Sequence, residues 1–371
     1  MAVSNSTKVA KYEQVRQSIR ASIASGEYKA GQRLPSESEL VNTFGASRIT
    51  VNRALRELQL AGIIDRRAGS GSYVRAQPER SYTFGLLIPD LGQTEIFEPI
   101  CRGMALAEET EHSHALLWSK AFGDSEPKES QATELCQRMV REKVAAAFFA
   151  PLELTPIKDA VNQVIVQTFD RAGIPIVLLD RDLVAYPARS RYDVVGIDNR
   201  RAGYAITSHL LEVGCRRTAF VCRLGSAPTV EARIAGYREA ILDSHCEWEP
   251  RFVQRIAPWD QDAVKEMLKA VKPDGIVCAN DFTAANLMKT LGALGVRVPD
   301  EIRLAGIDDV KYASLLPVPL TTIHQPCGKM GAAAVAAMVQ RIRNPDLPAR
   351  DILLDFHLVV RESTAGNKPS R

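Results

Sequence analysis

The chain has 371 residues, of which 46% are hydrophobic and 25% are charged, which excludes a disordered chain and provides for two or three packed domains. No apolar run approaches the roughly 18 residues of a membrane span, and the N-terminus lacks the apolar core of a signal peptide, so we expect a cytoplasmic protein with no membrane partner. The seven cysteines are scattered, without a C-x-x-C motif or a Cys/His cluster, which favours buried thiols over disulfides or a metal site.

The net charge of +3 is unevenly distributed along the chain. Residues 1–75 hold 12 basic and 6 acidic residues, whereas the rest of the chain holds 35 basic and 38 acidic residues. A small basic segment suits a polyanion such as DNA. Charge alone fits a solvated basic face equally well.

The first helix is predicted from Tyr12 to Ser25, where apolar residues recur every four positions until Gly26. Ser36 and Glu39 have the spacing of a capping box, which predicts the start of a short second helix. Gly45 provides a tight turn after it.

A third helix is predicted to begin at the cap residue Ser47 and to stop at Ala61 and Gly62. Two short extended stretches follow, Ile63 to Arg66 and Ser72 to Arg75, joined by a glycine-containing loop. Three helices and a hairpin in this order predict a winged helix-turn-helix, whose third helix enters the major groove of DNA.

The segment LPSESELVNTFGASRITVNRALRELQLAGIIDRRAGSGSYV closely resembles the winged-helix module of the GntR family over nearly its whole length. The resemblance implies that Arg48 and Thr50 contact DNA at the head of the third helix. Arg48 is chemically suited to bidentate recognition of guanine, whereas other arginines of this segment fit phosphate contacts or solvent equally well. Further contacts are implied for Lys11, Glu37, Ala68 and Gly69, and for Asn52, which stands where many relatives have arginine.

Residues 76–81 (AQPERS) are polar and contain a proline, and the hydrophobic pattern changes after them. We therefore expect a DNA-binding domain at 1–75, a linker at 76–81 and a second domain at 82–371.

The second domain alternates short apolar runs with amphipathic helices, which predicts parallel sheets covered by helices on both faces. The succession runs twice, so we expect an α/β domain of two lobes, with the second sheet beginning after the region of Asp180. A cleft between the lobes is where strand carboxyl ends bind ligands. The predicted strands are Phe84 to Ile88, Ala115 to Trp118, Ala145 to Phe149, Ile176 to Leu179, Val194 to Ile197, Ala219 to Cys222, Gly275 to Ala279 and Arg303 to Ile307.

Polar residues follow several of these strands and suit a polyhydroxylated ligand. Such a residue commonly just caps the next helix, and we favour that role for Asp198. For Asp180 and Asp308 we favour ligand binding.

From about Tyr82 to Glu362 the chain resembles the LacI/GalR effector domain, itself similar to periplasmic sugar-binding proteins, in phrases such as VLLDRD, VVGIDNRRAGYAITSHLLEVGCRRTAFV and GIVCANDFTAANLMKTLGALGVRVPDEIRLAGIDDV. The resemblance implies polar contacts to a sugar and aromatic contacts to the face of its ring. Cys327 stands where many relatives have a bulkier residue, and Gln325 or His324 are candidates to compensate. The implied pocket residues are Asp90, Phe97, Asp180, Arg233, Trp259, Asn280 and Asp308.

The chain lacks the hinge helix that LacI-type regulators carry between their two domains. A GntR-type head on a LacI-type body resembles the hybrid class of arabinose repressors (AraR), which makes L-arabinose or a related sugar the first ligand to test. Because Arg233 is the one cation counted among the pocket residues, we expect a neutral sugar.

We therefore predict a transcriptional repressor that binds a pseudo-palindromic operator as a homodimer and that a sugar controls, with no cofactor and no enzymatic activity. The alternatives are a regulator that responds to a non-sugar metabolite, a pyridoxal-phosphate enzyme-like regulator, and a transport receptor. The sequence contains no G-x-S-x-G, H-E-x-x-H or Walker motif. A transport receptor does not fit the absent signal peptide or the attached DNA-binding segment.

Overall fold

The computed structural model describes residues 11–24, 26–60, 62–67, 70–75, 82–88, 96–107, 114–117 and 127–365. The chain divides into two compact units, Met1–Arg80 and Ser81–Arg371, which we call the head and the body. The division falls within the stretch predicted as a linker, residues 76–81, and that stretch lies outside the described residues.

The described residues of the head form three helices and an antiparallel hairpin, which confirms the predicted winged helix-turn-helix. Ser36 and Glu39 form the capping box: the Glu39 N–H donates to Ser36 Oγ over 3.3 Å, and the Ser36 N–H donates to Glu39 Oε2 over 2.6 Å. Gly45 ends the second helix in the left-handed conformation, with φ at 54°, which glycine adopts without steric cost. The elements are α1 (Lys11–Ala24), α2 (Glu37–Phe44), α3 (Arg48–Leu60), β1 (Ile64–Arg67) and β2 (Gly71–Val74).

The core of the head is small and comes from all these elements. Val15 and Ile19 of α1 are one helical turn apart and pack with Leu40 of α2 and with Leu55 and Leu58 of α3. This arrangement leaves the N-terminal residues of α3 at the surface.

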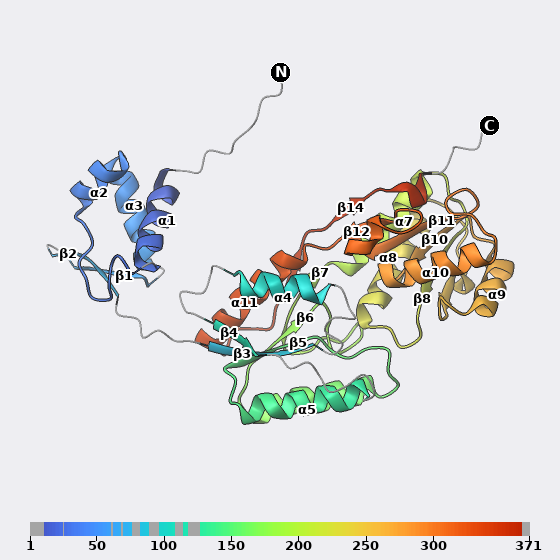
Figure 1. The fold of residues 1–371 in the computed structure, drawn as a ribbon, viewed down its shortest axis with the longest axis horizontal. Coiled ribbons are helices and arrows are strands. Elements are labelled where there is room, and N and C mark those ends of the chain that lie inside the picture. The colour runs from blue at the N-terminus through green and yellow to red at the C-terminus, as the bar shows by residue number, and fades with distance from the viewer. Residues whose placement is uncertain are drawn as a thin grey trace, which may run out of the picture. The chain divides into compact units, whose positions relative to one another are not determined.

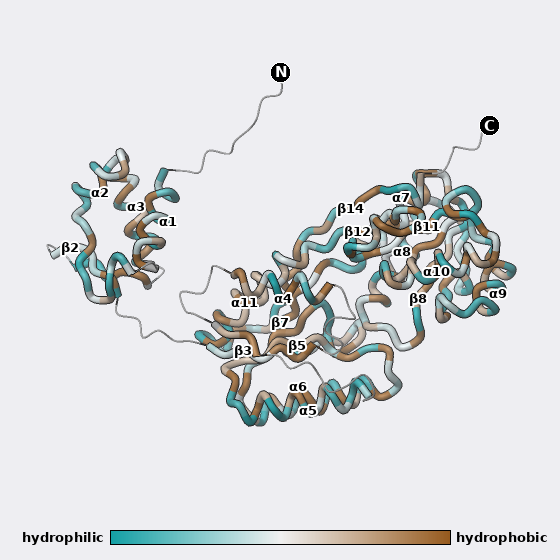
Figure 2. The backbone as a smooth tube through the Cα atoms, in the orientation of Figure 1, coloured by the Kyte–Doolittle hydropathy of each residue, from teal (hydrophilic) through white to brown (hydrophobic). Residues whose placement is uncertain are grey.

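The described residues of the body form two sheets, as predicted, and each is covered by helices (Figure 1). Each sheet has six strands, and four of these twelve strands are not among the eight predicted ones. The first sheet has the order β13-β7-β6-β5-β3-β4, and all its neighbouring strands are parallel. Figure 2 shows its strands β3, β5 and β7 as hydrophobic segments in the interior, which is typical of a sheet covered on both faces. Its strands are β3 (Tyr82–Leu87), β4 (His114–Leu117), β5 (Ala146–Phe149), β6 (Ile176–Leu179), β7 (Asp193–Ile197) and β13 (Asp351–Leu354); its helices are α4 (Phe97–Ala105), α5 (Lys128–Arg141), α6 (Lys158–Arg171) and α11 (Cys327–Arg343).

The second sheet has the order β14-β12-β11-β10-β8-β9 and is parallel except for β14. Alternate residues of β8 enter different cores: Phe220 and Cys222 pack with α7 and α8, whereas Ala219 and Val221 pack with α9 and α10. Its strands are β8 (Thr218–Cys222), β9 (Val253–Arg255), β10 (Gly275–Cys278), β11 (Arg303–Asp308), β12 (Thr321–His324) and β14 (His357–Val359); its helices are α7 (Asn199–Glu212), α8 (Pro228–Asp243), α9 (Gln261–Val271) and α10 (Asp281–Ala293), with short 3₁₀ turns at Pro250–Phe252, Lys311–Ser314 and Glu362–Thr364.

The second sheet begins later in the chain than we expected. Strand β7, which follows the Asp180 region, pairs with β6 and belongs to the first sheet. Residues 181–192 form a loop, and the chain first crosses to the other lobe after β7, where α7 packs against β10, β11 and β12. Continuous apolar strands read alike in either sheet, so the hydrophobic pattern could not place this crossing.

Two helix pairs cross closely because glycines face the partner backbone. A Cβ built on Gly103 of α4 would lie 2.0 Å from the carbonyl oxygen of Gly328 in α11. A Cβ on Gly236 of α8 would lie 1.9 Å from the carbonyl oxygen of Arg200 in α7. The first pair lies over the first sheet, and the second pair carries residues that reach between the two sheets.

Among the described residues, no helix has the length and apolar character required to cross a membrane. The seven cysteines are free thiols. In the same part of the chain, no group of three or more His, Cys, Asp or Glu side chains is placed to hold a metal ion.

Candidate DNA-binding face and effector cavity

The N-terminal end of α3 presents the side chains of Arg48 and Thr50, which are predicted to contact DNA. Ser47 caps the helix, since the Thr50 N–H donates to Ser47 Oγ over 3.2 Å and the two hydroxyl oxygens lie 2.8 Å apart. Arg48 is exposed, and Ile49, which sequence reasoning did not single out, is 84% exposed. A guanidinium and an aliphatic side chain at this position match guanine edges and thymine methyl groups, respectively.

Three further predicted or neighbouring residues form one polar network on the head. The Asn52 amide donates to Glu37 Oε1 over 3.4 Å and accepts from Arg66 Nη1 over 3.3 Å. The guanidinium of Arg66 also pairs closely with Glu37. The network joins α2, α3 and strand β1, so Asn52 has partners within the protein for both ends of its amide.

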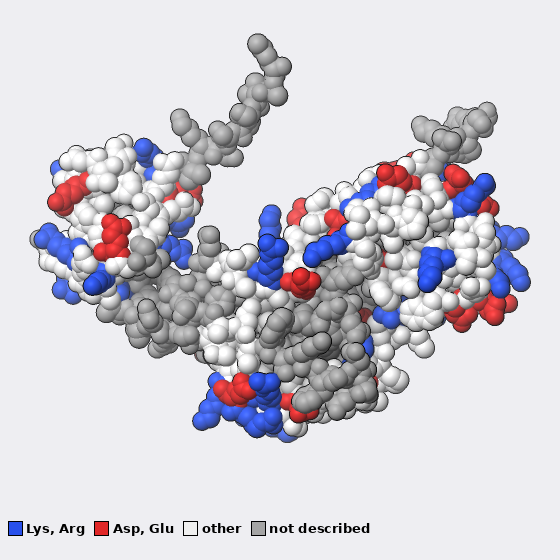
Figure 3. Space-filling model, viewed as in Figure 1, with Lys and Arg blue, Asp and Glu red and all other residues white. Residues whose placement is uncertain are grey.

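The remaining predicted DNA contacts lie at the edges of this face. Lys11 is the first residue of α1 and is exposed. Ala68 and Gly69 lie outside the described residues. Figure 3 shows Lys and Arg side chains around the hairpin end of the head, on the face in view.

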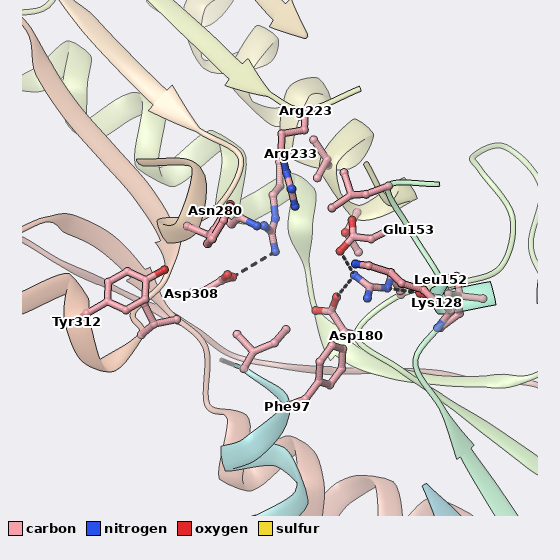
Figure 4. Close-up of a pocket in the computed structure, with 18 residues that line it drawn as sticks. Phe97, Lys128, Leu152, Glu153, Asp180, Arg223, Arg233, Asn280, Asp308 and Tyr312 are labelled. Carbon is pink, nitrogen blue, oxygen red and sulfur yellow. Dashed lines mark hydrogen bonds and ion pairs between the residues drawn. The ribbon is translucent and has the colours of Figure 1, made fainter. Parts of the chain in front are cut away.

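The body contains a cavity of about 430 Å³ where the carboxyl ends of the two sheets meet, within the range of small-molecule sites. Five of the predicted pocket residues line it (Figure 4): Phe97, Asp180, Arg233, Asn280 and Asp308. Trp259 does not line the cavity; it is 52% exposed and lies edge-on to Phe282, which does. Asp90 lies outside the described residues.

The backbone is strained at the two acids that lie at the carboxyl ends of strands. Asp180, directly after β6, has φ at 69°, and Asp308, the last residue of β11, has φ at 129°. Leu154, which also lines the cavity, has φ at 62°. Positive φ is costly for a residue with a Cβ, and such strain concentrates at binding sites.

Asp180 is buried, and the side chain of Asp308 is only 12% exposed. Asp180 Oδ1 has no hydrogen-bond partner among the described residues. Burial raises the pKa of Asp180, with the charges of Arg181 and Arg233 acting against it. Burial raises the pKa of Asp308 to about 8; Arg233 opposes this rise, and Asp281 and Asp180 add to it. A ligand hydroxyl that donates to Asp180 Oδ1 would supply the hydrogen bond that this buried oxygen lacks.

Arg233 is held in place by groups from both helices and strands of the second lobe. Its Nε donates to Asn199 Oδ1 over 2.8 Å, and its Nη1 donates to the Ala279 carbonyl over 2.6 Å. Nη2 lies 3.8 Å from Asp308 Oδ1, to which Gln325 also donates over 2.7 Å. The guanidinium is therefore preorganised beside Asp308 (Figure 4).

Asn280 and Asp198 both cap helices. Asn280 Oδ1 accepts from the Thr283 N–H over 2.9 Å and from its hydroxyl over 2.7 Å. Because Asn280 also lines the cavity, its amide nitrogen is the group that can donate to a ligand. Asp198 accepts from the Arg201 N–H over 3.0 Å, the capping role that we favoured for it.

Sequence reasoning missed a charged pair in the wall of the first lobe. Arg181 Nη1 lies 2.6 Å from Glu153 Oε1 and 3.6 Å from Asp180 Oδ2. Burial acts to raise the pKa of Glu153, but Arg181, the Ala227 amide and Arg223 together hold it below its usual value. Arg181 adjoins Asp180 in the VLLDRD phrase and could have been included, whereas no sequence signal marks Glu153.

Cys327 is buried at the start of α11 and is not among the described residues that line the cavity. The expectation of a neutral sugar counted Arg233 alone, but Lys128, Arg181 and Arg223 also line the cavity. The premise of that expectation therefore does not hold.

Comparison with known proteins agrees with this two-part organisation. Residues 11–74 match the family described as bacterial regulatory proteins, gntR family, and residues 207–364 match the periplasmic binding protein-like domain. The chain is 29% identical to the arabinose metabolism transcriptional repressor of Geobacillus stearothermophilus, over 95% of this chain and 97% of the relative.

Solved structures of transcriptional regulators share the fold. A complex of the transcriptional regulator CelR with cellobiose is 25% identical, with a TM-score of 0.63 over 86% of this chain and 91% of the other. A LacI family regulator from Enterococcus faecalis V583 with bound ribose is 26% identical, with a TM-score of 0.60 over 77% of this chain and all of the other. The chain is thus a DNA-binding transcriptional regulator that joins a GntR-family head to a periplasmic-binding-protein-like body of the LacI type.

Proposed function

We propose that the chain represses carbohydrate-utilisation genes and that a sugar bound in the cavity of the body controls its affinity for operator DNA. The observation that carries the proposal is a pair of acids with positive φ, the buried Asp180 and the partly buried Asp308, which enter one cavity from two sheets together with Arg233. Acceptors and a forked donor around one space suit a ring with several hydroxyl groups. Phe97 provides an apolar surface for the carbon face of such a ring.

The first sugars to test are L-arabinose and its relatives, because the chain is similar to an arabinose metabolism repressor along nearly its whole length. In this proposal Asp180 and Asp308 accept from hydroxyl groups, and Arg233 and Asn280 donate to ring or hydroxyl oxygens. In this proposal Trp259 does not contact the sugar, and it acts through Phe282, against which it packs and which lines the cavity.

On the DNA side, we propose that Arg48 and Thr50 contact bases or phosphates and that Lys11 contacts the backbone. Glu37 and Asn52 then orient Arg66 through their network, and Ala68 and Gly69 belong to the wing. A single winged helix reads only a short half-site. We therefore propose a homodimer on a pseudo-palindromic operator, since two-fold pairing doubles the contacts.

The test is binding of the purified chain to DNA from its own upstream region, titrated with pentoses and hexoses. We expect specific binding that one sugar weakens. The variant Arg48→Ala should lose specific binding, whereas Arg238→Ala, on the surface of α8, should not. DNA binding that no sugar affects would contradict the role of the cavity, and absence of DNA binding would contradict the whole proposal.

A further inference from the structure

Arg223 is a cavity residue that the proposed sugar contacts do not use. It directly follows β8, is half-buried and lines the cavity (Figure 4). Its guanidinium carbon lies 5.2 Å from the ring centre of Phe282 and 5.8 Å from that of Trp259. Cation–π contacts of this kind attract the guanidinium without a carbonyl or carboxylate acceptor for its N–H groups.

Within the described part of the chain, the guanidinium of Arg223 has no hydrogen bond or ion pair. The other two cavity arginines differ, because Arg181 pairs with Glu153 and Arg233 donates to Asn199 and Ala279. Glu153 is the acid whose charge acts on Arg223, but its two oxygens already accept from Arg181 and from the Ala227 N–H. Arg223 is therefore a donor for which the described protein supplies no acceptor.

The charged side chains around the cavity also favour a ligand with an anionic group. The described lining includes the cations Lys128, Arg181, Arg223 and Arg233 and the acids Glu153, Asp180 and Asp308. Burial raises the pKa of Asp308, which favours its uncharged form and reduces the negative charge that faces these cations. Burial also lowers the pKa of Arg223, although the charge of Glu153 opposes this, so the cation is incompletely compensated.

We propose that the effector is an acidic sugar derivative whose carboxylate or phosphate group pairs with Arg223 while its hydroxyl groups meet Asp180 and Asp308. The inference rests on the proposed function and refines it, from a sugar to a sugar with an anionic substituent. A planar guanidinium with free in-plane donors binds either anion through two parallel hydrogen bonds. Phe282 and Trp259 act as positioning residues, because their rings hold the guanidinium in place.

The experiment compares matched pairs of neutral and acidic sugars by calorimetric titration of the full chain. Suitable pairs are D-galactose with D-galacturonate and D-ribose with ribose 5-phosphate, and L-arabinose is titrated beside them. In at least one pair, we expect the acidic member to bind at least about tenfold more tightly, the contribution of one charge-assisted contact. The pair that responds distinguishes a carboxylate ligand from a phosphate ligand.

Variants then test whether Arg223 is responsible. Arg223→Gln should reduce the acidic-to-neutral affinity ratio by at least about tenfold, and Arg223→Lys should restore part of it. Arg238→Gln on the surface of α8 is the matched control and should leave the ratio unchanged.

Three results would overturn the inference. If the neutral sugar binds as tightly as its acidic partner in every pair, or if Arg223→Gln weakens both members equally, Arg223 does not select an anion, and the proposed sugar regulator still stands. If no member of any pair binds, the sugar-binding function itself fails, and the inference fails with it.

Discussion

The adjacent residues Asp308 and Asp309 have opposite effects on how the stability of the folded chain depends on pH. Burial raises the pKa of Asp308 to about 8, so the folded chain holds a proton there that the unfolded chain has lost. Asp309 is partly buried, and hydrogen bonds from Arg361 and His324 outweigh the effect of burial and lower its pKa. Asp308 therefore costs stability once the pH exceeds its unfolded pKa, whereas Asp309 stabilises the same strand end.

The first prediction concerns this pair. With a raised pKa, the contribution of Asp308 is present below its unfolded pKa of about 4 and is lost as the pH rises towards 8. Asp308→Asn keeps a neutral group at the site, so the melting temperature of the ligand-free variant should exceed that of the parent by about 2 °C or more near pH 9, and by less near pH 5. The same variant should bind the effector more weakly.

Asp309→Asn is the matched comparison with the opposite sign. A lowered pKa gives stability that is present above the unfolded pKa and is lost as the pH falls. This variant should therefore melt below the parent at neutral pH, and the difference should shrink in acid. If Asp308→Asn also melts below the parent near pH 9, Asp308 does not have a raised pKa and does not destabilise the folded chain at alkaline pH.

At the scale of elements, the position of Arg233 depends on how closely α7 and α8 cross. Arg233 lies one helical turn before Gly236, and a Cβ at Gly236 would come within 1.9 Å of the Arg200 carbonyl oxygen and 2.7 Å of the Tyr204 nitrogen. Backbone atoms cannot yield as the end of a side chain can. The two helices must therefore separate if any larger residue replaces this glycine.

We predict that Gly236→Ala destabilises the chain by about 1–3 kcal/mol, the usual cost of overpacking. It should also weaken effector binding, because α8 carries Arg233 away from Asn199 and Ala279. Urea unfolding and ligand titration measure the two effects. Gly292→Ala in α10, where nothing lies within 4 Å of the added Cβ, should be neutral or stabilising by up to about 1 kcal/mol. Equal effects of the two substitutions would contradict the role of the crossing.

The sequence predicts the elements whose signals are local. The capping box of Ser36 and Glu39, the eight apolar strands and the acids at strand ends depend on spacings of a few residues. The sequence gives no comparable signal for β13 and β14, which are short and only partly buried, or for the pairing of Arg181 with Glu153, 28 residues away. Arg223 was missed because its importance lies in the acceptor it lacks, which only the surrounding side chains reveal.

At the scale of the whole molecule, DNA binding and ligand binding belong to different compact units. A ligand can change operator affinity only if it binds the DNA-bound and DNA-free forms with different affinity. The chain can be free, bound to ligand, bound to operator or bound to both. Because the free-energy change from the free to the doubly bound chain does not depend on the order of binding, operator must change the ligand Kd by the same factor as ligand changes the operator Kd. A regulator must therefore show equal changes in both Kd values, whereas a chain that binds DNA and ligand independently shows no change in either.

The last prediction follows from this reciprocity. If the effector raises the operator Kd by some factor, typically about 5 to 150 for allosteric coupling, saturating operator must raise the effector Kd by the same factor. Calorimetric titration of effector into the free chain and into the operator complex gives one ratio, and operator titrations with and without effector give the other. A scrambled DNA of equal length, at the same salt concentration, controls for nonspecific phosphate contacts. An effector that binds both forms with equal affinity cannot release the operator, and such a result would leave the cavity without a regulatory role.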